Sequence, residues 1–152
     1  MFQYKSLSSP FKRKTSGVKK GNVLIVDDDV AMRTILVSVL SKDFDVEAKR
    51  NGMEAMNWLS EGNLPDVIVS DIMMRQLNGY DFIRALRQSG VYATIPVLVL
   101  SGHDVKNTEE EVLRLGADSY LSKPFDPRVI LDFVLKAHLQ NVALKRPSYL
   151  RN

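Results

Sequence analysis

Residues 23–29 read Val-Leu-Ile-Val-Asp-Asp-Asp, four apolar residues followed at once by three acids. A continuous run of aliphatic residues predicts a strand that is buried on both faces, as in a parallel sheet. Asp27, Asp28 and Asp29 then place carboxylates directly at the carboxyl end of that strand. The same combination of an apolar run and a polar end recurs along the chain, and it indicates the fold class.

Three further apolar runs end in polar residues of complementary kinds. They are Val67–Ser70 before Asp71, Val97–Leu100 before Ser101, and Tyr120–Ser122 before Lys123. If these strands are parallel, their carboxyl ends meet at one edge of the sheet, where open α/β sheets bind ligands. Such an edge would bind a divalent cation and present a carboxylate to a phosphoryl donor.

Helix-like segments alternate with the strand-like runs. The first has apolar residues at helical spacing after a capping Asp29: Met32, Ile35, Leu36, Val39 and Leu40. Three further helices are predicted between Asn51 and Gly62, between Gly79 and Gly90, and between Glu109 and Gly116, and a last helix begins at Asp126 and Pro127. The remaining two strands are predicted at Phe44–Ala48 and Ser119–Leu121. Five strands alternating with five helices predict an α/β fold, a doubly wound five-stranded parallel sheet covered on both faces.

The composition is that of an ordinary globular protein with an uneven distribution of charge. The 152 residues are 45% hydrophobic, include no Cys, and contain no apolar stretch long enough to span a membrane. Residues 1–20 hold six Lys or Arg and residues 145–152 hold three, with no acid in either, so the net charge of +3 leaves −6 on residues 21–144. We therefore expect a flexible basic arm, a core that does not bind DNA directly and, without a signal segment, a cytoplasmic protein.

The clustered carboxylates favour a hard metal ion. Carboxylates that meet at one point repel each other, and without a cation at least one tends to keep a proton. Oxygen ligands suit Mg²⁺ or Mn²⁺, whereas zinc usually recruits Cys or His, and the chain holds only His103 and His138. An Asp beside such a cation can attack phosphorus and form an acyl phosphate, while a lysine neutralises charge on the transferring oxygens.

These residues together resemble a known family, the CheY-like receiver domain of bacterial two-component response regulators. The matching residues are Val26-Asp27-Asp28, Asp71 with Met74 and Gly79 behind it, Ser101-Gly102, and Tyr120 ahead of Lys123-Pro124-Phe125. The resemblance covers residues 21–142 and leaves a basic arm of residues 1–20 and a short basic tail of residues 143–152. It implies a (βα)5 flavodoxin-like fold with strand order 2-1-3-4-5.

The resemblance implies that Asp71 is the phosphoacceptor. It would receive a phosphoryl group from the phosphohistidine of a sensor histidine kinase or phosphotransfer protein. Asp28, Asp71 and the main-chain carbonyl of Met73 would ligate Mg²⁺. Asp27 would act mainly through a metal-bound water.

The resemblance also implies a switch around the phosphoryl group. Ser101, Gly102 and Lys123 would hold its oxygens, and Tyr120 would turn inward as Ser101 moves toward it. That motion would remodel the face formed by the fourth helix, fifth strand and fifth helix, which a downstream protein or a missing output domain reads. Such a protein is no conventional enzyme: it would at most phosphorylate itself from phosphodonors and dephosphorylate itself, as a monomer or weak phosphorylation-dependent homodimer.

The chain departs from the family pattern near the phosphoacceptor. Arg75 stands where the family usually has proline, which predicts a less rigid loop and a positive charge near the site. Asn78 replaces the usual acid before Gly79, a change that still suits a turn. Met73 and His103 fall at the two positions that line water's path to the phosphoryl group in this family.

Three other functions fit the sequence less well. A phosphorylation-independent interaction module on the same fold would be expected to lack Asp71, an Mg²⁺-binding acid or Lys123, and none is lost. A flavin protein of similar topology needs a loop after the first strand that is rich in hydroxyls and glycine, and here that loop is acidic. A phosphohydrolase with an Asp nucleophile needs a second acid where Met73 stands and chain for a cap domain. With few residues after 142, we expect either a stand-alone receiver or a fragment of a longer regulator.

Overall fold

The computed structural model describes residues 17–102 and 107–145. In this part of the chain, strands and helices alternate without exception. They are β1 (Asn22–Val26), α1 (Val30–Leu40), β2 (Asp45–Lys49), α2 (Gly52–Ser60), β3 (Val67–Asp71), α3 (Gly79–Gln88), β4 (Val97–Ser101), α4 (Thr108–Leu115), β5 (Ser119–Ser122) and α5 (Pro127–Lys145). The predicted alternation of five strands with five helices is confirmed.

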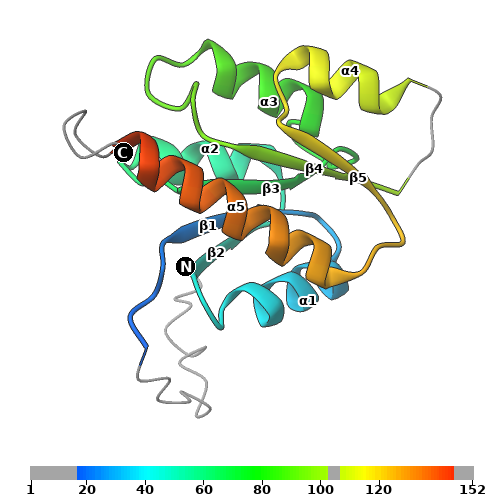
Figure 1. Ribbon diagram of the computed structural model, residues 1–152. Coiled ribbons are helices and arrows are strands. Elements are labelled where there is room, and N and C mark those ends of the chain that lie inside the picture. The colour runs from blue at the N-terminus through cyan, green and yellow to red at the C-terminus, as the bar shows by residue number, and fades with distance from the viewer. Residues whose placement is uncertain (1–16, 103–106, 146–152) are drawn as a thin grey trace, which may run out of the picture.

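The strands form one parallel sheet in the order β2-β1-β3-β4-β5, which confirms the doubly wound fold (Figure 1). β1, β3 and β4 are central and almost wholly buried, as their continuous apolar runs predict. Asp71 and Ser101 are the last residues of their strands, since each still pairs in register with a neighbouring strand. The second strand begins one residue later than predicted, at Asp45.

Helices cover both faces of the sheet, and a separate apolar cluster lies under each layer (Figure 1). On one face Ala55 and Leu59 of α2 pack with residues of α3 and α4 against β1, β3 and β4. On the other, Leu36 and Leu40 of α1 pack with residues of α5. Ile35, which the helical spacing grouped with these residues, is instead 43% exposed.

Three helices begin at side-chain caps, of which Asp29 and Asn51 were predicted and Asn78 was not. The side chains of Asp29, Asn51 and Asn78 each accept hydrogen bonds from main-chain N–H groups two or three residues further on. Gly116 ends α4 with φ +111°, a conformation that favours glycine. These local features therefore fix where each of the helices begins or ends.

The two ends of the described chain are attached to the core. Lys20 donates its main-chain N–H to the carbonyl of Asp43 at 2.8 Å and forms an ion pair with its carboxylate, also at 2.8 Å. Lys19 donates to the carbonyl of Ser41. At the other end α5 continues to Lys145, three residues beyond the domain boundary that the sequence suggested.

None of the helices in residues 17–102 and 107–145 has the length and apolar character needed to cross a bilayer.

Candidate functional site

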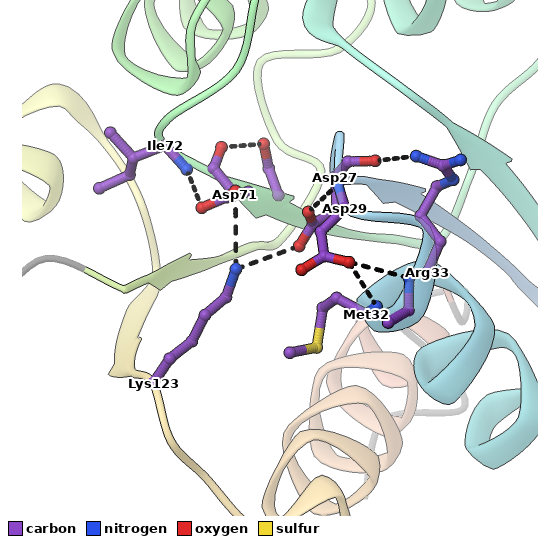
Figure 2. Close-up of polar contacts among 9 residues, drawn as sticks. Asp27, Asp29, Met32, Arg33, Asp71, Ile72 and Lys123 are labelled. Atoms are coloured by element: carbon purple, nitrogen blue, oxygen red, sulfur yellow. Dashed lines mark hydrogen bonds and ion pairs between the residues drawn. The ribbon is translucent and has the colours of Figure 1, made fainter.

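Lys123 and two buried acids meet at the carboxyl edge of the sheet. The Lys123 Nζ atom lies 3.3 Å from Asp27 Oδ2 and 3.6 Å from Asp71 Oδ2 (Figure 2). These side chains come from the ends of β1, β3 and β5, and Asp27 and Lys123 are 96 positions apart in the sequence. Three distant segments thus build one polar pocket where the sequence predicts it.

Asp71 is held rigidly at the end of β3. Its side chain is buried, and Oδ1 accepts a 2.8 Å hydrogen bond from the N–H of Ile72. The loop that follows folds back over this point, because the N–H of Gly79 donates to the carbonyl of Ile72 at 2.8 Å. Oδ2 faces Lys123 and the other acids, so one oxygen is anchored and the other faces the pocket.

Asp27, Asp28 and Asp29 share one turn but differ in environment. Asp27 is buried and accepts a 2.9 Å hydrogen bond from the N–H of Asp29, whose own side chain caps α1. Asp28 is exposed. One carboxylate oxygen each from Asp27, Asp28 and Asp71 lies within 4.8 Å of the other two. The run of three acids therefore supplies two pocket carboxylates and one helix cap.

The turn after β1 has a further anchor that the sequence did not reveal. Arg33 on α1 donates a 2.8 Å hydrogen bond to the main-chain carbonyl of Asp27. A spacing of six residues between an arginine and an aspartate is too common to be a signal. Only the path of the chain from β1 into α1 brings the guanidinium to this carbonyl.

The pocket disfavours its own negative charge. Burial first, and then the charge of Asp27, raise the pKa of Asp71 to about 6, against the lowering effect of Lys123. Burial likewise raises the pKa of Asp27, although the N–H of Asp29 and the ammonium of Lys123 lower it. One lysine thus compensates three close carboxylates only in part.

The donor set of this pocket fits a hard divalent cation. All three side chains offer carboxylate oxygens, and the pocket has more acids than its single lysine neutralises. A bound Mg²⁺ would favour the ionised forms that burial disfavours. The acidic pocket is therefore compatible with the metal that the sequence predicts.

The other predicted site residues lie around this pocket. Ser101 is buried at the end of β4, and its carbonyl accepts a 2.7 Å hydrogen bond from the N–H of Lys123. A side chain at Gly102 would lie 3.7 Å from the Lys123 side chain, so Gly102 adjoins the lysine. Tyr120 is half-buried against the cluster under α2, α3 and α4, and the side chain of Met73 is 56% exposed. His103 lies outside the described residues.

The fold and this pocket define a class, the phosphoacceptor signalling domains with a flavodoxin-like sheet. A model of the response regulator receiver domain matches residues 23–135. The chain therefore belongs to the response-regulator receiver family, and its function is that of a phosphoacceptor in two-component signalling.

Individual relatives agree with this assignment. The chain is 34% identical over 140 residues to the alkaline phosphatase synthesis transcriptional regulatory protein SphR of Synechococcus elongatus, a match that covers 85% of this chain and 54% of that protein. It thus spans about half the length of the curated relatives it matches.

Solved structures show the same architecture. The receiver domain of a signal transduction histidine kinase from Syntrophus aciditrophicus matches with a TM-score of 0.75 and 31% identity, over 84% of this chain and 95% of that one. The chemotaxis response regulator CheY4 of Vibrio cholerae matches with a TM-score of 0.69 and 30% identity, over 76% and 97%. The predicted flavodoxin-like receiver fold is therefore confirmed.

Proposed function

We propose that Asp71 accepts the phosphoryl group and that Lys123 neutralises charge on it. The observation that carries this proposal is the position of Lys123 Nζ, 3.6 Å from Asp71 Oδ2 in a pocket of three carboxylates. Asp71 is the pocket acid whose one oxygen is fixed by a main-chain N–H while the other faces the lysine. It is therefore the carboxylate best placed to act as a nucleophile.

The transfer forms one bond and breaks another. An oxygen of the ionised Asp71 carboxylate attacks phosphorus, and the phosphorus–nitrogen bond of a phosphohistidine breaks. The departing nitrogen keeps the electron pair, and the ring leaves as neutral imidazole because its other nitrogen carries a proton in the donor. Lys123 stabilises negative charge on the phosphoryl oxygens. Ser101, whose carbonyl accepts from the N–H of Lys123, and the turn at Gly102 would hold another oxygen.

Asp28 and Asp71, with Asp27 behind them, would hold Mg²⁺ or Mn²⁺, assisted by the main-chain carbonyl of Met73. The metal would supply charge neutralisation for the phosphoryl oxygens. Of these residues, Asp27 and Asp71 are already oriented by main-chain N–H groups and by Lys123. The chain's own contribution is thus a set of oxygens arranged before the metal binds.

Downstream, we propose that phosphorylation acts on α4, β5 and α5. Ser101 and Lys123 lie at the ends of β4 and β5, and half-buried Tyr120 lies on β5, three residues before Lys123. New charge beside Ser101 would shift this face between two states that a partner protein distinguishes. We expect a cytoplasmic switch that is served by a histidine kinase or phosphotransfer protein and acts on a protein target or output domain.

The test is phosphorylation by a small acyl phosphate in the presence of Mg²⁺, followed by intact-mass and peptide mass spectrometry. We expect one phosphoryl group on the wild-type protein and none on Asp71→Asn, which keeps the size of the side chain. A chelator should abolish the reaction. Asp81→Asn, an exposed acid on α3, is the matched control and should react like the wild type. An unmodified wild-type protein, or an equally modified Asp71→Asn, would contradict the proposal and favour the phosphorylation-independent module.

A further inference from the structure

A polar groove lies beside the carboxylate cluster, on the β2 side of the sheet edge. It has a volume of about 440 Å³, and its walls come from the loops that follow β1, β2 and β3. The lining residues are Asp28, Arg50, Asn51, Glu54, Arg75 and Gln76. Because Asp28 belongs to both the groove and the carboxylate cluster, the groove adjoins the site of phosphoryl transfer.

Two arginines line the groove, and they differ in their partners. Arg50 donates to the Glu54 carboxylate from Nε at 3.0 Å and from Nη2 at 2.6 Å, so these two charges cancel. Arg75 is exposed and forms no ion pair with any acid of residues 17–102 and 107–145. Within the described groove, Arg75 is therefore the cation that remains available to a ligand.

The loop that carries Arg75 is packed onto the start of α2. The N–H of Met53 donates to the carbonyl of Gln76 at 3.4 Å, and Gln76 and Leu77 adopt positive φ values of 52° and 62°. A side chain at Gly52 would lie 2.4 Å from the Leu77 carbonyl, so only glycine permits this approach. The main chain around Arg75 is thus held beside the groove, although the proline that the family favours is missing.

We infer that Arg75 is a specificity-determining residue that favours dianionic phosphodonors, acyl phosphates in particular. This inference rests on the proposed function of Asp71. Lys123 serves the pocket from the β5 side, whereas Arg75 lines the groove on the β2 side. A dianionic donor that approaches three carboxylates meets strong repulsion, and a second cation on the other side reduces it.

The reaction with an acyl phosphate balances without any further reactant. The Asp71 oxygen forms a bond to phosphorus while the bond between phosphorus and the acyl oxygen breaks, and the leaving carboxylate keeps the electron pair. With phosphoramidate the phosphorus–nitrogen bond breaks and ammonia leaves, from a donor that is close to a monoanion at neutral pH. The two donors therefore differ in charge while they transfer the same group to the same atom.

The test compares the rates with acetyl phosphate and phosphoramidate, each with saturating Mg²⁺, by intact-mass spectrometry. We expect Arg75→Met to slow the reaction with acetyl phosphate about three- to ten-fold and that with phosphoramidate about two- to three-fold, since the effect of an exposed charge scales with donor charge. Arg75→Lys should restore most of the rate and Arg75→Glu should lower it further. High salt should shrink all these differences.

Arg84→Met on α3 is the matched control, because it removes the same charge from an exposed arginine outside the groove. It should leave the ratio of the two rates unchanged. Equal slowing of both donors by Arg75→Met, or no slowing, would overturn the inference while phosphorylation of Asp71 itself stood. A wild-type protein that neither donor phosphorylates would overturn the proposed function and this inference together.

Discussion

At the scale of single residues, the main feature of the site is that its negative charge is only partly compensated by nearby cations. Asp71 is 5% exposed, and the nearest cation is one ammonium that it shares with Asp27. A buried carboxylate in this position costs free energy when it is ionised, and the raised pKa records that cost. In the proposed function, the same unfavourable charge would provide the affinity for a metal and the reactivity toward phosphorus.

This charge makes the stability of the metal-free protein depend on pH. Because the pKa of Asp71 rises from its usual 3.8 to about 6 on folding, the folded state binds the proton more tightly. The contribution of Asp71 to stability is therefore greatest below pH 4 and is lost as pH rises toward 6, by about 2–3 kcal/mol. In chelator we expect Asp71→Asn to be more stable than the wild type at pH 7 and similar to it near pH 4, measured by denaturant unfolding.

Saturating Mg²⁺ is the control for this measurement. It should raise the stability of the wild type at pH 7 far more than that of Asp71→Asn, because the metal binds the ionised folded state. A stability difference between the two proteins that stays constant from pH 4 to 7 would show that Asp71 is not the titrating group.

At the scale of elements, the loops after the strands position the site. The end of the loop between β3 and α3 is hydrogen-bonded to its start, because the N–H of Gly79 donates to the carbonyl of Ile72. A Cβ atom at Gly79 would lie 2.5 Å from the Asp71 carbonyl oxygen and 2.6 Å from the Ile72 Cα. Both are main-chain atoms of the segment that carries Asp71, so they cannot rotate away as a flexible side chain would.

We therefore expect Gly79→Ala to displace the main chain at Asp71. It should lower the free energy of unfolding by about 1–3 kcal/mol and slow phosphorylation by acyl phosphate. Gly90→Ala is the matched control, because nothing lies within 4 Å of its added Cβ and its φ is not positive. It should be neutral or stabilising by up to about 1 kcal/mol. Gly79→Ala with the stability and rate of the wild type would show that the loop tolerates a side chain there.

A second set of element contacts positions the strand that carries Lys123. Arg87 of α3 donates to the carbonyl of Gly116 at 2.9 Å and pairs with Asp118 Oδ2 at 3.0 Å. The same carboxylate oxygen accepts a 2.8 Å hydrogen bond from the N–H of Val97. These contacts join α3 to the starts of β4 and β5, the two strands whose far ends carry Ser101 and Lys123.

At the scale of the whole molecule, we propose that the receiver domain occupies residues 21–142, with a basic arm before it and a short basic tail after it. The end of that arm nearest the domain contacts the turn between α1 and β2, through Lys19 to Ser41 and Lys20 to Asp43. This turn is at the amino-terminal edge of β2, at the opposite edge of the sheet from Asp71. Lys19 and Lys20 therefore contact the domain far from the carboxylate cluster.

Deletion of residues 1–18 should leave phosphorylation and stability unchanged, since the contacts of Lys19 and Lys20 remain. Deletion of residues 1–20 should lower the free energy of unfolding by about 1 kcal/mol, because it removes a main-chain hydrogen bond, the hydrogen bond of Lys19 to Ser41 and one exposed ion pair. Both proteins should still react with acyl phosphate in Mg²⁺. Mass spectrometry measures phosphorylation, and denaturant unfolding measures stability. Loss of phosphorylation in either truncated protein would contradict the proposed division of the chain into an arm and a receiver domain.

Much of the architecture was predictable because its signals are local. The buried central strands are apolar runs, and Asp29 and Asn51 cap helices through hydrogen bonds that span two or three residues. Prediction failed where burial depends on a neighbouring helix. Ile35 has the helical spacing of Leu36 and Leu40, yet only the side of α1 that carries Leu36 and Leu40 packs with α5. The hydrogen bond of Arg33 to Asp27 was also missed, because its partner is a main-chain carbonyl, which every residue has.

The amino-acid sequence by itself determined the alternation of strands and helices and the acids, hydroxyl and amine at the strand ends, because residue type and spacing set local conformation. Only the tertiary structure decided that Asp27 is buried while Asp28 is exposed, that Lys123 lies 3.3 Å from Asp27, and that the pKa of Asp71 rises to about 6. Burial and Coulomb energy depend on distances between groups, and those distances exist only after segments remote in sequence have packed together.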